Sequence, residues 1–158
     1  MSLQSGGLFN KVCISYSIVD YKDIPENKNN YRGVIISASP KGDDITQEQL
    51  PFYQWIPEYS KPIIGSCHRN QLLGTLFGSR IIMGKEAEEG IFPVQVMKND
   101  VIFEGLKTIF KVEQHHIKSI TLPISFNLLA SSGQCKNQIM KHNYKPIYGC
   151  QFHIEHSL

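Results

Sequence analysis

The segment around Cys67 combines a thiol with the pattern of a sharp turn between a strand and a helix. Residues 62–71 run Pro-Ile-Ile-Gly-Ser-Cys-His-Arg-Asn-Gln, with a glycine two residues before the cysteine. Such a glycine allows a tight turn that presents a nucleophile on a strained elbow. The dipole and the first N–H groups of the following helix favour the thiolate, and the N–H of His68 can face a developing oxyanion. The segment therefore predicts a nucleophilic cysteine.

A reactive thiol also needs a base, and the end of the chain offers one. His153 and Glu155 follow an apolar run and lie two residues apart, so in an extended segment they share a face. The carboxylate would then hold the imidazole in the correct tautomer. Taken singly, such a cysteine is more often a core residue, and such a histidine or glutamate is usually on the surface. The two segments together favour a Cys-His-Glu triad.

The remaining pattern supplies strands and helices that can position these residues. In the first half, apolar strands are expected at 11–19, 33–37 and 62–65, with helices at 46–56 and 70–77. Mostly strands follow, at 79–83, 92–97, 110–114, 124–131, 138–141 and 147–152, with a helical turn at 103–109; the last two strands are expected to form a hairpin. This order predicts an α/β fold whose parallel sheet carries an antiparallel extension.

Composition fits one soluble domain over residues 1–158. The 158 residues are 41% hydrophobic and 19% charged, and the net charge of +2 is too small to indicate nucleic acid. No apolar stretch approaches the roughly 20 residues of a membrane-spanning helix. Residues 1–7 are small and polar, could be a tag or disordered, and lack the apolar core of an export signal, so the cytoplasm is the expected location. The four cysteines form no CxxC pair, which indicates reduced thiols rather than a disulfide or zinc scaffold.

Three blocks of the sequence together resemble the class I glutamine amidotransferase family. Residues 62–71 resemble its PxxGxCxGHQ elbow, 148–155 its QFHPE triad segment and 34–40 its SGGP oxyanion loop. The blocks come in the family's order, and the resemblance extends over most of the chain from about Val12 onward. It implies a flavodoxin-like, Rossmann-like three-layer sandwich with a mostly parallel central sheet.

The resemblance also implies an activity, namely hydrolysis of the side-chain amide of glutamine. Cys67 would form a glutamyl thioester, and His153 would protonate the departing ammonia and then activate water. By position, Ser39 and His68 would supply the oxyanion-hole N–H groups, and Gln71 matches the glutamine-pocket residue. Ammonia would pass to a synthetase partner. No metal or other cofactor is implied.

Several positions depart from the family pattern. Arg69 replaces the glycine after the nucleophile, where a long charged side chain could block glutamine or select another carboxylate. Asn70 replaces the family's histidine. Ala38 and Ser39 replace the oxyanion-loop glycines, which would be strained if the loop needs positive φ. Ile154 replaces the proline of the triad segment, and a mild effect is expected.

The start of the chain is shorter than the family pattern. The family's first strand and helix are expected to be missing before residues 11–19, which would expose an edge of the sheet. An exposed edge favours pairing with another chain, so a homodimer is one expected assembly.

Three functions stay open at this point. The first is a glutaminase that feeds ammonia to a synthetase. The second is a degenerate amidotransferase-like binding or regulatory protein, which Arg69, Ala38 and Ser39 favour. The third is a related thiol hydrolase acting on γ-glutamyl amides or peptides. His115 and His116 are a weaker candidate for metal binding, because adjacent histidines on a strand point apart.

Overall fold

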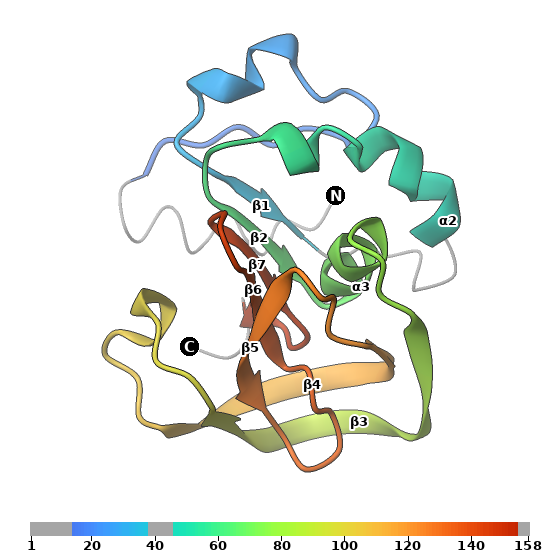
Figure 1. The fold of residues 1–158 in the computed structure, drawn as a ribbon, viewed down its shortest axis with the longest axis vertical. Helices are drawn as coiled ribbons and strands as arrows, with labels where there is room; N and C mark the ends of the chain where they lie inside the picture. Colours follow the sequence, from blue (N-terminus) through green and yellow to red (C-terminus); the bar gives the residue numbers. More distant parts are fainter. Residues whose placement is uncertain (1–13, 38–45, 155–158) are drawn as a thin grey trace.

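The computed structural model describes residues 14–37 and 46–154, and these form a seven-stranded mixed sheet (Figure 1). The strand order is β1-β2-β7-β6-β5-β3-β4. The strands are β1 (Val34–Ile36), β2 (Ile63–Ser66), β3 (Ile81–Val96), β4 (Ile109–Ile120), β5 (Phe126–Ser131), β6 (Ile139–His142) and β7 (Ile147–Cys150).

The sheet has a parallel half and an antiparallel half. β1, β2 and β7 pair in parallel, whereas β7–β6, β6–β5, β5–β3 and β3–β4 pair antiparallel. The predicted α/β class, with an antiparallel extension and a β6–β7 hairpin, is confirmed. The antiparallel half is larger than the prediction of a mostly parallel sheet implied, because β3 and β4 are much longer than the strands expected there.

The helices of the described residues are short. They are η1 (Glu26–Asn30), α2 (Thr46–Gln49), η3 (Leu50–Tyr53), η4 (Ile56–Glu58), α3 (His68–Leu76) and η5 (Val101–Phe103). The helix predicted at 46–56 is divided, because Pro51 and Pro57 each open a 3₁₀ segment and cannot donate to the preceding turn. The helical turn predicted at 103–109 lies earlier, in η5. None of the helices in the described ranges is long and apolar enough to cross a membrane.

The strand predicted at 11–19 is wrong for the part that the structure describes. Residues 14–19 are exposed and adopt no regular structure, and residues 11–13 lie outside the described ranges. The physical reason is a missing partner: within the described ranges, β1 pairs with β2 alone and is therefore an edge strand. Apolar, β-branched residues form a strand only where a neighbouring strand accepts their hydrogen bonds.

The β3–β4 ribbon is the largest departure from the predicted elements. The strands predicted at 79–83 and 92–97 are parts of one strand, β3, which pairs along most of its length with β4. Figure 1 shows this ribbon running across the ends of the other strands at a steep angle. The pairing shifts register between Met83 and Glu88, and this irregularity explains why the sequence pattern is interrupted there.

The core lies on both faces of the sheet. Leu72 and Leu73 of α3 pack with Met140 and Ile147 on one face, together with η3 and η4. On the other face, Ile139 and the neighbouring Cys150 pack against residues of the β3–β4 ribbon, including Val94 and Val112. Adjacent residues of β6 thus enter different clusters, as the two-residue period of a strand requires. The sheet is therefore covered by helices on one face and by the curled ribbon on the other.

Candidate active site

Cys67 occupies a strained turn between β2 and α3. Its backbone has φ 54° and ψ −116°, and it is the one non-glycine residue with positive φ in the described ranges. Such a conformation costs on the order of 1–3 kcal/mol and concentrates at functional sites. The cysteine is the N-cap of α3, and its N–H donates to the carbonyl of Cys150 at 2.8 Å. The predicted elbow is confirmed in the backbone.

Gly65 serves the elbow through packing rather than through its own turn geometry. A Cβ at this position would lie 2.7 Å from Cδ1 of Leu73 and 2.9 Å from the carbonyl oxygen of Arg69. The absence of a side chain lets α3 approach the end of β2. This corrects the expected reason for the glycine: its φ is not in the left-handed region, and the close approach of the helix is what requires it.

The parallel pairing of β2 and β7 brings the triad segment to the elbow. Ser66 is the register partner of Cys150, so Cys67 and His153 leave the same carboxyl edge of the sheet. The Ser66 hydroxyl donates to the carbonyl of Phe152 at 3.2 Å, and the N–H of His153 donates to the carbonyl of Glu113 on β4 at 3.3 Å. His153 is half-buried at this edge. Glu155 lies outside the described residues, so its role stays a prediction.

Asn70 and Gln151 form a second link between the elbow helix and the triad segment. The Asn70 side chain donates to Oε1 of Gln151 at 3.1 Å, and both residues are fully buried. Gly149 makes room for this pair, because a Cβ there would overlap the Asn70 side chain and lie 2.7 Å from Cε of Met140. Sequence reasoning noted Asn70 only as a departure. The signal was available: a glycine in the strand that precedes the triad histidine indicates a close approach.

Arg69 lies buried against α2 and the tyrosines. Its Nε donates to the carbonyl of Ser37 at 3.0 Å, its Nη1 donates to Gln49, and its guanidinium lies 5.5 Å from the ring centre of Tyr53 and 5.9 Å from that of Tyr21. Burial lowers the pKa of Arg69, against a smaller opposite effect of Tyr53. These contacts hold the arginine to the end of β1, and its predicted role toward a substrate carboxylate stays a prediction.

The other predicted substrate residues are placed only in part. His68 is the buried first residue of α3, where the N–H groups point out of the N-terminal end of the helix. Gln71 is fully buried, and its Nε2 donates to the carbonyl of Lys118 on β4 at 3.2 Å. Ser39, with the rest of the predicted oxyanion loop after Ser37, lies outside the described residues. The geometry therefore supports one half of an oxyanion hole and leaves the other half untested.

Comparison with known proteins decides the family. The model of the family "Glutamine amidotransferase class-I" matches residues 8–158. The chain belongs to the class I glutamine amidotransferase family. The elbow and the triad segment lie within the matched range, so the resemblance seen in the sequence is confirmed at the level of the family.

Individual relatives carry more specific names. The chain is 34% identical to a subunit of the glutamine-hydrolysing GMP synthase of Pyrococcus abyssi, over 80% of this chain and 67% of that protein, and 34% identical to its counterpart in Pyrococcus furiosus, over 78% and 66%. It therefore spans about two thirds of the length of these relatives. A crystal structure of a protein from Thermoplasma acidophilum, described in the same terms, superposes with a TM-score of 0.89 at 28% identity, covering 96% of this chain and 77% of that one.

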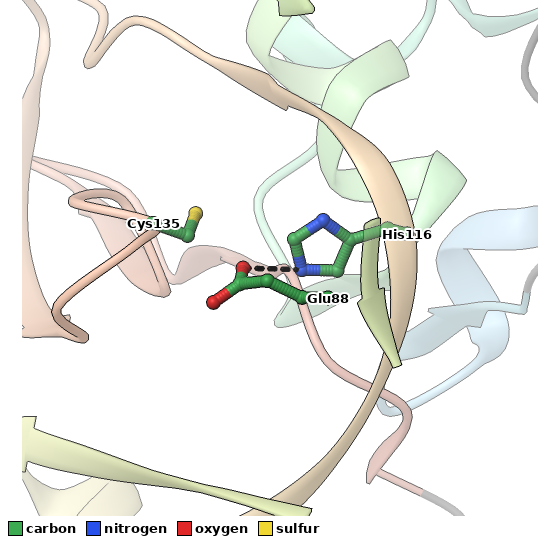
Figure 2. Close-up of side chains that lie close together, drawn as sticks. All are labelled: Glu88, His116 and Cys135. Atoms are coloured by element: carbon green, nitrogen blue, oxygen red, sulfur yellow. Dashed lines mark ion pairs between the residues drawn. The ribbon is translucent and has the colours of Figure 1, made fainter. Parts of the chain in front are cut away.

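A second group of reactive side chains lies away from the elbow, and sequence reasoning missed it. Glu88, His116 and Cys135 are all buried, and their potential ligand atoms lie within 4.8 Å of one another (Figure 2). The neighbouring histidines do point apart as predicted: His115 is exposed and lies 3.7 Å from Glu89, whereas His116 lies 3.2 Å from Glu88. A glutamate and a histidine at matching positions of two paired strands were the available signal.

Proposed function

We propose that this amidotransferase-family chain hydrolyses the side-chain amide of glutamine and supplies ammonia to a synthetase. The Cys67 thiolate attacks the amide carbon, and the oxyanion that forms accepts a hydrogen bond from the backbone N–H of His68. His153 protonates the nitrogen, and ammonia leaves a glutamyl thioester. Water, activated by the same imidazole, then attacks the thioester and releases glutamate and the free thiol.

The observation that carries the proposal is the strained backbone of Cys67 at the start of α3. A buried core cysteine gains nothing from φ 54°, whereas a nucleophile gains a fixed approach to its substrate and the positive end of a helix dipole. The β2–β7 pairing supports the proposal, because it directs the histidine segment to the same edge. Glu155 would orient the imidazole in this scheme.

The names of the relatives indicate the partner to test first. Both Pyrococcus proteins are described as subunits of a glutamine-hydrolysing GMP synthase. We therefore propose that the acceptor of ammonia is a separate GMP-forming synthetase. A homodimer through the exposed β1 edge stays a prediction, since Ile35 in that strand is 46% exposed.

Arg69 is the specific observation that favours a second function. The family places a glycine here, and this chain places a buried arginine tied to Ser37 and Gln49, directly before the predicted oxyanion loop. If this linkage fixes the loop in an unproductive position, the chain is a binding or regulatory protein with an amidotransferase fold. A hydrolase for other γ-glutamyl amides would share the thiol chemistry and differ only in substrate.

The test is ammonia release from L-glutamine by the whole chain, with and without the candidate synthetase and its substrates. Cys67→Ser removes the nucleophile, and Cys150→Ala is the matched control because it removes a buried thiol from the adjacent strand. Turnover that is lost in the first variant and kept in the second supports the proposal. Labelling by an electrophilic glutamine analogue, located by peptide mass, is the second readout.

The outcomes separate the three functions. Turnover only with the synthetase present supports a partner-dependent glutaminase. Absence of turnover on glutamine, with Cys67 labelled and other γ-glutamyl amides hydrolysed, overturns the glutaminase in favour of the related hydrolase. Neither turnover nor labelling under any of these conditions overturns both and supports the degenerate protein.

A further inference from the structure

The β3–β4 ribbon contains a wide bulge that opens a cavity. Met83 pairs with Lys118 and Glu88 pairs with His116, so residues 84–87 of β3 stand opposite Ile117 alone. A Cβ on Gly84 would lie 2.7 Å from the carbonyl oxygen of Ile117, so glycine lets the two backbones meet where the bulge begins. Bulges of this kind redirect side chains and occur preferentially next to functional sites.

The cavity beside the bulge has a volume of about 330 Å³ and a mixed polar lining. Glu88, His116 and Cys135 form its inner wall, and they are 4%, 8% and 3% exposed. Lys85 and Gln134 line it as well. The space is large enough for several water molecules or a small ligand beside the three side chains.

The three side chains come from three different elements and converge. Figure 2 shows Glu88 from β3, His116 from β4 and Cys135 from the loop after β5, pointing toward one another. Oε2 of Glu88 lies 3.2 Å from Nε2 of His116, and one ligand atom from each residue lies within 4.8 Å of the others. Ligand bonds of 2.0–2.3 Å in a tetrahedral zinc site place neighbouring ligand atoms roughly 3.3–3.8 Å apart. A rotation of the Cys135 side chain is sufficient to reach that spacing.

The surroundings of His116 resemble those of a metal ligand. Gln114, two residues away on the same face of β4, places Oε1 2.8 Å from Nε2 of His116. Nε2 of Gln114 is fully buried and has no hydrogen-bond partner among the described residues. Metal-bound histidines are held by such neighbouring polar groups. The group as a whole brings a carboxylate out of water, which is expensive unless a cation lies beside it.

We propose that Glu88, His116 and Cys135 bind a divalent cation of the Zn²⁺ type. Thiolate, imidazole and carboxylate together suit Zn²⁺, and three protein ligands next to a cavity leave a fourth position for water or a small ligand. On binding, the Cys135 thiol loses its proton to solvent and releases its hydrogen bond to the carbonyl of Asn137. The imidazole stays neutral, with its proton on the nitrogen that does not face the ion. This site was not expected from the sequence, which indicated no metal.

The alternative occupant is no ion at all. In that case Glu88 and His116 form a buried ion pair, Cys135 is a core thiol, and the cavity holds only water. The two arrangements differ in what they do with a soft cation, since the ion pair neither binds Co²⁺ nor yields a thiolate ligand to it.

The experiment is a titration of the reduced whole chain, freed of metal, with Co²⁺ followed by Zn²⁺. Co²⁺ bound to a thiolate has a near-ultraviolet charge-transfer band, and Zn²⁺ should displace it at one equivalent. His116→Gln and Cys135→Ser should each lose the band. His115→Gln is the matched control, because it removes the adjacent, exposed histidine of the same strand, and Cys67→Ser removes the thiol of the elbow. Both controls should keep the band.

A readout on the unaltered chain guards against variants that fail to fold. One equivalent of Zn²⁺ should protect Cys135 from alkylation in a brief unfolding pulse and should raise the temperature of unfolding. A thiolate band that vanishes in Cys67→Ser and persists in Cys135→Ser overturns the proposal. The absence of a band, of protection and of a raised unfolding temperature in the unaltered chain overturns it as well.

Discussion

The parallel half of the sheet and the β3–β4 region each hold a buried cysteine, and the two are held in opposite ways. Cys67 is 6% exposed and Cys135 is 3% exposed, so burial alone does not distinguish them. The first is fixed by its backbone, at a positive φ on the first turn of a helix. The second is fixed by its side-chain neighbours, a carboxylate and an imidazole from two other elements.

The electrostatic consequences differ accordingly. Burial raises the pKa of Cys135 to about 12, and the nearby carboxylate of Glu88 contributes in the same direction, against a hydrogen bond with Asn137. A thiol in such surroundings stays protonated unless a cation replaces the proton. At the elbow, the helix N-terminus acts in the direction of the thiolate. The comparison teaches that the backbone prepares one cysteine for attack, while the side chains prepare the other for binding.

The largest expected effect is a difference in alkylation rate between the two cysteines. At pH 7 a thiol with a pKa of about 12 is ionised to roughly one part in 10⁵, so iodoacetamide should modify Cys135 at least about a thousandfold more slowly than Cys67 in the reduced, metal-free chain. Peptide mass spectrometry over a time course measures both sites in one sample. Equal rates in the folded chain would remove the distinction between the two regions.

Gly65→Ala should test how strictly the parallel half depends on backbone approach. The added Cβ meets the backbone of Arg69 at 2.9 Å, which no rotation of a side chain can relieve, so we expect a loss of about 2–3 kcal/mol in unfolding free energy. Urea denaturation provides the measurement. Gly133→Ala is the control, because a Cβ there has no atom within 4 Å. Similar stabilities of the two variants would show that the elbow tolerates a shift of α3.

Arg69→Met should distinguish packing from polar linkage at the same elbow. Methionine retains much of the stem but leaves the Ser37 carbonyl and Gln49 without their donor, so we expect a loss of about 1–3 kcal/mol. Arg80→Met, at an exposed position, should change stability by less than about 0.5 kcal/mol. Ammonia release should be measured on the same variants. A rise in turnover in Arg69→Met would show that the arginine restrains the site.

The elbow could be predicted from the sequence because backbone demands leave marks on residue type. A close helix approach and a sharp turn require glycine at Gly65, and the residues around Cys67 follow one another in the chain. Local order is what a sequence displays directly. The same reasoning located β1, β2, α3 and the β6–β7 hairpin within a few residues.

The second cluster could not be predicted, because its members are distant in sequence and ordinary in type. Glu88, His116 and Cys135 meet only through the β3–β4 register and its bulge, and a shift of one residue would turn His116 to the other face. The strand expected at 11–19 failed for a related reason. Its apolar pattern is that of a strand, but pairing depends on a neighbour that the pattern does not specify.

The smallest expected effect concerns the charge network that joins η5 to the hairpin in the antiparallel half. Asp100 accepts hydrogen bonds from Lys141 at 2.5 Å, from Tyr148 at 3.1 Å and from the N–H of Ile102 at 3.2 Å. Burial alone would raise the pKa of Asp100, but the hydrogen bonds from these groups outweigh it and lower the pKa. The ionised form is therefore the one that the fold stabilises.

Asp100→Asn should remove about 1 kcal/mol of stability at pH 7, since the amide retains shape but loses the charge-assisted bonds. A lowered folded-state pKa contributes stability above the unfolded value of about 3.9, and this contribution disappears as the pH falls through the folded value. The difference between Asp100→Asn and the unaltered chain should therefore shrink below about pH 4. Urea titrations from pH 7 downward measure it, with the exposed Asp23→Asn as the control. A difference that persists undiminished at low pH would mean that shape, and not charge, holds η5 to the hairpin; the antiparallel half would then depend on close packing just as the elbow does.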